Sequence, residues 1–162
     1  MKSAVLAAAM FVVGVLLMSA DSGRADSRLT GMATVMGTCQ KLVIAGQDRS
    51  LECTGRLLNT DYDDRRTGFY FILLNGGVIT FSNRGDLEER AGPDKRVAPV
   101  DLVIIGQYPN KKIDRVPAKG RCRYGNLFKG RPSLIECSAD SELGRFEATF
   151  LSNGEKPELK TF

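Results

Sequence analysis

The sequence contains a cysteine-bracketed segment twice. GTCQKLVIAGQDRSLECTG occupies residues 37–55 and GRCRYGNLFKGRPSLIECSA occupies residues 120–139. Each copy begins Gly-x-Cys, carries a Gly seven residues before its second Cys, and ends in an apolar residue, Glu, Cys and Thr or Ser. An even number of cysteines without a Cys-x-x-Cys pair is typical of a disulfide framework. This pattern predicts two structural staples rather than a redox or zinc site.

The positions of the cysteines also favour one pairing. Within each copy the two cysteines are symmetric about a glycine-containing turn, which would place them opposite each other on a β-hairpin. Directly opposed residues have Cβ atoms close enough for a disulfide. We therefore predict the bridges Cys39–Cys53 and Cys122–Cys137. The pairings Cys39–Cys122 with Cys53–Cys137, and Cys39–Cys137 with Cys53–Cys122, remain open alternatives that would tie the two copies together.

Residues 1–25 have the features of a signal peptide. A basic Lys2 precedes an uncharged apolar run over 4–20, and Gly23 and Ala25 place small residues at −3 and −1 of a cut before Asp26. An uncleaved membrane anchor is the alternative, but the apolar run is at the short end of a spanning length. We expect cleavage, a mature protein that does not span the membrane, and a periplasmic or secreted location.

The rest of the chain predicts a mainly β fold. Hydrophobic residues alternate in short runs separated by Gly, Pro, Asn and Asp, and Asn75-Gly76 marks a hairpin turn. We expect a loose leader over 26–36 and one disulfide-stapled domain over 37–162. This domain is predicted to be a small antiparallel barrel or sandwich with partial internal duplication and at most one short helix, over 86–91. The expected strands cover 38–45, 50–58, 68–75, 77–83, 100–106, 118–125, 133–140 and 144–152. The run 52–82 resembles the opening three-strand meander of an OB-fold barrel.

A basic segment over residues 111–131 is the main candidate for function. It contains Lys111, Lys112, Arg115, Lys119, Arg121, Arg123, Lys129 and Arg131 against Asp114 alone, in a chain of net charge +4. Such a segment favours a polyanion ligand. The hairpin register would pair Arg123 with Glu136 and Lys119 with Asp140. The candidate anion-binding residues are therefore Lys111, Lys112, Arg115, Arg121, Tyr124, Lys129 and Arg131. The expected partner is an anionic envelope component or another envelope protein, and no specific nucleic acid. The sequence does not determine the oligomeric state.

Other functional motifs are weak. The run 59–64 places oxygen ligands at alternate positions, as in a calcium loop, but lacks the required Gly and Glu. Arg84-Gly85-Asp86 spells an adhesion tripeptide that also occurs by chance. The chain has no His and none of the common nucleophile motifs, so we expect no enzyme, no cofactor and no metal site. Two alternatives to the binding protein remain. One is an inhibitor of an envelope-degrading hydrolase that uses a loop over 59–67, and the other is a structural envelope protein.

Overall fold

The computed structural model describes residues 27–162, so the predicted signal peptide lies outside the described part of the chain. The regular structure of this part consists of β-strands and two short 3₁₀ turns, η1 (Ser50–Glu52) and η2 (Gly85–Leu87). The strands, in chain order, are β1 (Leu29–Ile44), β2 (Gln47–Asp48), β3 (Cys53–Tyr62), β4 (Arg66–Leu73), β5 (Val78–Arg84), β6 (Glu89–Gly92), β7 (Lys95–Gly106), β8 (Ile113–Gly125), β9 (Leu134–Ser141), β10 (Gly144–Ser152) and β11 (Glu158–Thr161).

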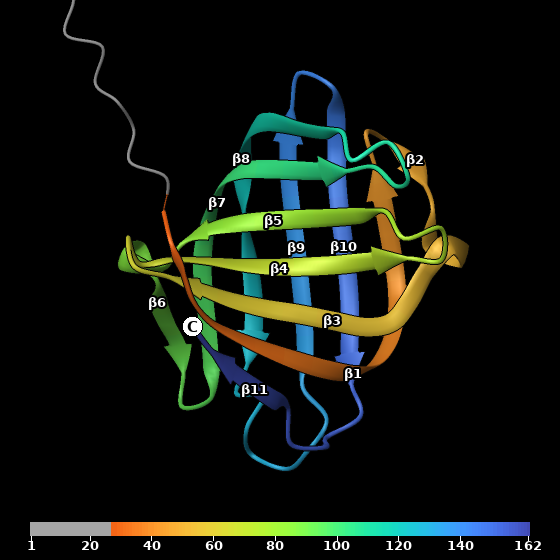
Figure 1. Cartoon of the computed structure of the whole chain (residues 1–162). Coiled ribbons are helices and arrows are strands. Elements are labelled where there is room, and N and C mark those ends of the chain that lie inside the picture. Colours follow the sequence, from red (N-terminus) through yellow and green to blue (C-terminus); the bar gives the residue numbers. More distant parts are fainter. Residues whose placement is uncertain (1–26) are drawn as a thin grey trace, which may run out of the picture.

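The sheet closes into an antiparallel barrel. The strand order β10-β9-β8-β7-β5-β4-β3-β1 is completed by a further pairing between β10 and β1. In Figure 1, β1, β3, β4 and β5 run across the front of the barrel, while β9 and β10 run nearly at right angles behind them. β2, β6 and β11 lie outside the closure, each added to one barrel strand. The predicted mainly β fold is confirmed, and of the two expected architectures, barrel and sandwich, it is the barrel. It has more closing strands than the five-stranded OB-fold that residues 52–82 resemble.

The barrel core follows from alternation along the strands. Along β4 and β5, most inward positions carry buried apolar side chains, with Phe69, Phe71 and Phe81 fully buried. Phe146 and Phe150 of β10 are likewise fully buried and point into the core from the opposite wall of the barrel. Phe71 and Phe81 meet edge to face with ring centroids 5.7 Å apart. Each buried phenylalanine contributes about 2–3 kcal/mol of hydrophobic free energy, so these rings hold the two walls together.

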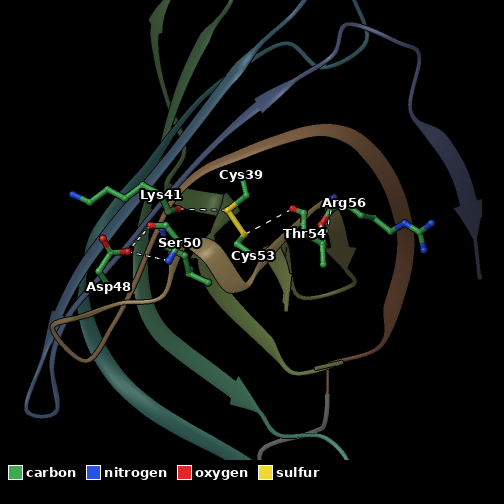
Figure 2. The surroundings of a disulfide bond; sticks show 8 residues. Cys39, Lys41, Asp48, Ser50, Cys53, Thr54 and Arg56 are labelled. Atoms are coloured by element: carbon green, nitrogen blue, oxygen red, sulfur yellow. Dashed lines mark hydrogen bonds between the residues drawn. A yellow bond between two sulfur atoms is a disulfide. The ribbon is translucent and has the colours of Figure 1, made fainter. Parts of the chain in front are cut away.

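The first disulfide, Cys39–Cys53, lies where β1 changes its neighbour. The first half of β1 pairs with β3, ending at Met36 opposite Arg56, and the second half pairs with β10 from Gly37 onward. Cys39 and Cys53 lie three residues beyond the last β1–β3 pair and are bonded, with their Cα atoms 5.9 Å apart. Figure 2 shows this bridge beside the short β2–η1 excursion. The bridge therefore keeps β3 attached to β1 at the point where the two strands separate.

The second disulfide, Cys122–Cys137, joins two directly opposed residues of β8 and β9. Both sulfur-bearing side chains are in the core, at 0% and 3% exposure. The predicted opposition of these two cysteines is thus confirmed, although a connection over 126–133 joins the strands in place of a short turn. Both predicted bridges are present, and the described residues contain no free cysteine.

Several expected boundaries are wrong. The segment 26–36 is not a loose leader, because from Leu29 onward it forms the start of β1, whose edges pair with β3 and β11. The helix expected over 86–91 is absent: η2 occupies one turn there and β6 then pairs with β7. The loop expected over 59–67 is reduced to residues 63–65, since β3 and β4 continue through the rest as a hairpin. In these three places strand pairing, which a local pattern does not reveal, decided the structure.

Strands β7 and β8 both begin about five residues earlier than predicted, and β11 was not predicted. Over residues 27–162, no helix has the length and apolar character needed to cross a membrane.

Candidate functional site

A pocket of about 330 Å³ lies beside the β6–β7 hairpin and the β8–β9 connection. Figure 1 shows strands β6 to β9, which these two connections join. Ligand sites for small molecules begin at about this volume. Its charged lining consists of Lys95, Arg96, Arg123 and Arg131 with Asp94 and Glu136. The remaining lining residues are uncharged and include Asn126, Ser133 and Leu134. We refer to this site as the basic pocket.

Strand register explains how the basic pocket forms. Antiparallel pairing places Val97 opposite Arg123, and Arg123 in turn opposite Glu136, so three adjacent strands present these side chains on one outer face. Side chains at alternate positions of a strand share a face. Lys95 and Gly125 are likewise opposed at the strand ends. The connection 126–133 then brings Arg131 back over the same ends.

Two of the four cations in the basic pocket already have partners. Arg131 binds Asp94, and Lys129, from the same connection, binds the other carboxylate oxygen of Asp94. These two cations lower the pKa of Asp94, with the Lys129 hydrogen bond as the largest cause. Arg96 donates to Glu88 at 2.6 Å. The single carboxylate of Asp94 thus pairs with both Lys129 and Arg131, so one positive charge remains unbalanced beside Asp94.

The other two cations of the basic pocket, Lys95 and Arg123, make no ion pair among residues 27–162. Arg123 faces Glu136 in the β8–β9 register, as predicted, but the two side chains do not form a salt bridge in the described chain. Lys119 also faces Asp140 as predicted, yet the Asp140 carboxylate binds Arg145 at 2.8 Å instead. The predicted neutralisation of Arg123 is therefore not seen, which leaves its guanidinium available to a ligand.

The basic segment of the sequence does not converge on one site. Lys111 and Lys112 precede β8, whereas Lys129 and Arg131 follow it. A strand of 13 residues spans about 40 Å, so these two pairs belong to opposite ends of the barrel. Lys112 also binds Asp114 at 3.2 Å.

The other candidate residues take separate positions. Arg121 projects outward from the middle of β8, and Arg115 lines a different groove. Tyr124 lines the basic pocket, but its ring packs edge to face on Phe69 at 4.9 Å and its hydroxyl donates to Glu88. Burial and then Glu88 raise the pKa of Tyr124. Of the predicted set, only Arg131 and Tyr124 line the basic pocket, and Lys129 reaches its edge through Asp94.

The sequence prediction missed Lys95, Arg96 and Arg123 as site residues. Lys95 and Arg96 lie outside the expected strands, and Arg123 was expected in a cross-strand ion pair with Glu136. The adjacent Lys95-Arg96 after a Pro-Asp turn was the available signal. The proximity of Lys95 and Arg96 to Arg123 depends on the β7–β8 pairing, which no local sequence pattern predicts.

A second, larger groove runs along the outer face of β3, β4, β5, β7 and β8, with a volume of about 790 Å³. Its floor is made of small residues such as Gly68, Thr80 and Ser82. Within this groove, Arg66 makes two hydrogen bonds of 2.7 Å to Asp101. The positive charge of Arg66 is therefore balanced by Asp101 within the fold. This bidentate pair raises the pKa of Arg66 and lowers that of Asp101. The groove therefore carries less unbalanced charge than the basic pocket.

The weaker motifs find no support. The calcium-loop-like run 59–64 is mostly part of β3, and the described residues contain no cluster of three or more His, Cys, Asp or Glu side chains that could bind a metal. In the adhesion tripeptide, Arg84 and Asp86 bind each other at 2.7 Å.

Comparison of the chain with protein-family models, with curated proteins and with solved structures found no match.

Proposed function

We propose that this is an exported, non-enzymatic binding protein of the cell envelope or its surroundings, and that it takes a small anionic group in the basic pocket. The observation that carries this proposal is the pair Lys95 and Arg123, which line one pocket and have no ion-pair partner in the described chain. An anion there gains charge-assisted hydrogen bonds, which are about twice as strong as neutral ones. The two disulfides are consistent with maturation outside the reducing cytosol.

The size of the pocket limits the ligand. A volume of about 330 Å³ accommodates a phosphate or sulfate group with a short substituent, or one charged sugar unit, rather than an extended polymer. The exposed apolar side chain of Leu134 and the ring of Pro132 line the same pocket and offer contact to such a substituent. We therefore favour a phosphorylated or sulfated small molecule, or the terminal group of an anionic glycan or lipid.

The test is a titration of the mature protein with inorganic phosphate, followed by the amide and arginine Nε shifts in ¹H–¹⁵N NMR spectra. Saturable shifts are expected at Arg123, Gly125 and Ser133. The double variant Lys95→Gln with Arg123→Gln should weaken binding at least tenfold, because each charge-assisted hydrogen bond contributes about 1.5–3 kcal/mol.

The chain offers a matched control for the lost charge. The double variant Lys111→Gln with Lys112→Gln also removes two positive charges, but at the opposite end of β8. Its phosphate affinity should stay within about twofold of the wild-type value. If both double variants weaken binding equally, the effect is one of net charge and the pocket is not the site. If phosphate produces no saturable shift at these residues, the proposal is wrong.

A further inference from the structure

The inward face of the barrel becomes polar at one end. In β4 and β5 the inward positions that follow Phe69 and Phe81 toward this end are Thr67 and Asn83. In the neighbouring strand β3, Asp61 is opposite Thr67. The register Asp61–Thr67–Asn83 therefore places three polar side chains side by side on the inner face of adjacent strands.

Two side-chain oxygens of this row are buried without a partner. Asn83 is 0% exposed. Its side-chain Nδ2 donates to the Phe81 carbonyl at 3.3 Å, but its side-chain Oδ1 has no hydrogen bond. The Oγ1 atom of Thr67 is also buried without a partner. Each buried, unsatisfied polar atom costs about 1–3 kcal/mol, and native proteins contain few of them. Two such atoms on directly paired residues indicate that something else supplies the donors.

The third member of the row, Asp61, brings a negative charge to the rim. Its carboxylate makes no hydrogen bond or ion pair among residues 27–162, and its side chain reaches solvent. Partial burial and the nearby Glu88 raise the pKa of Asp61. Glu88 itself is occupied, because it accepts from Arg96 and from the Tyr124 hydroxyl. The row therefore presents one carboxylate and two buried oxygens that accept no hydrogen bond from the described chain.

We propose that Asp61, Thr67 and Asn83 form a binding site for the primary ammonium group of a small organic molecule. An ammonium carries one positive charge and three N–H donors, and the row offers one carboxylate and two neutral oxygens on three adjacent strands. A calcium ion fits less well, because it takes six to eight oxygen ligands and these three side chains provide at most four. None of these three residues lines the basic pocket, although Glu88, the neighbour of Asp61, binds Arg96 and Tyr124 of that pocket.

The test is a titration of the mature protein with n-butylammonium chloride, monitored at the Asn83 side-chain amide and the Thr67 backbone amide by NMR. We expect saturable shifts at both. Tetramethylammonium chloride has the same charge but no N–H donor and should produce none. The variant Asp61→Asn should weaken butylammonium binding at least tenfold, and Asp114→Asn, which removes an acid at the other end of the barrel, should leave binding unchanged.

Several outcomes would overturn this assignment. These are the absence of saturable shifts with butylammonium, equal shifts with tetramethylammonium, or saturable shifts at the same residues with calcium chloride instead. Full retention of binding in Asp61→Asn would also contradict it. The variant Lys95→Gln with Arg123→Gln should still bind butylammonium, so this inference and the proposed anion binding can fail independently.

Discussion

The two disulfides provide a quantitative test of the fold, because they close loops of nearly equal length but differ in burial. Their sequence separations are 14 and 15 residues. In the chain-entropy model each bridge then contributes about 3 kcal/mol to the free energy of unfolding. Cys122 and Cys137 lie in the core, whereas Cys39 and Cys53 are only partly buried against it. Replacement by alanine should therefore cost more at the second bridge.

The size of the difference follows from the lost packing. Removing two buried sulfur atoms from the core should cost a further 1–2 kcal/mol, roughly the value of one or two buried methylene groups with the cavity they leave. We expect a loss of about 3 kcal/mol for Cys39→Ala with Cys53→Ala, and of about 4–5 kcal/mol for Cys122→Ala with Cys137→Ala.

The assay is urea unfolding at 25 °C, monitored by far-ultraviolet circular dichroism and tyrosine fluorescence, since the chain has no tryptophan. Unchanged far-ultraviolet spectra before unfolding would confirm that both variants keep the barrel. An equal loss in the two variants, or a greater loss at the Cys39–Cys53 bridge, would refute the reasoning from burial.

Three further substitutions or truncations test other parts of the structure. Gly120→Ala should destabilise the barrel by several kcal/mol or prevent folding, because the added Cβ would lie 1.9 Å from the Ser138 carbonyl oxygen. Thermal unfolding measures this loss. A melting temperature within 2 °C of the wild-type value, equivalent to about 0.5 kcal/mol, would contradict the prediction. Deleting residues 158–162 should lower the free energy of unfolding by about 1 kcal/mol or less, since β11 is exposed and lies outside the eight-strand closure. Loss of the folded circular dichroism spectrum would instead show that β11 is essential. Asp61→Asn should raise stability at pH 7, because the raised pKa of Asp61 means that its ionised form opposes folding. This gain should shrink as the pH falls through the folded pKa and vanish below about pH 3.8, the unfolded value; a gain that is independent of pH would exclude the carboxylate as its cause.

The sequence predicted the covalent and local features well. The symmetry of each cysteine pair about a turn predicted both bridges, and Asn75-Gly76 marked the turn between β4 and β5. Alternation predicted most of the strands. These features depend on residues close together in the chain, where spacing alone determines geometry.

The site could be predicted only in part, because it depends on which strands become neighbours. Arg131 was identified from charge density, but the grouping of Lys95 with Arg123 requires the β7–β8 register. Likewise, Asp61, Thr67 and Asn83 come from three strands, and only pairing reveals that their polar side chains share one inner face. The spread of Lys111 and Lys129 to opposite ends of β8 has the same origin, since a continuous basic segment becomes a long extended strand.

The most direct test of the proposed function is the phosphate titration of wild type beside the variant Lys95→Gln with Arg123→Gln, each at 50 and 200 mM sodium chloride. We expect saturable binding by wild type at low salt, weaker binding at high salt, and at least tenfold weaker binding by the variant. Binding that is unchanged in the variant at both salt concentrations would contradict the assignment of the basic pocket as the anion site.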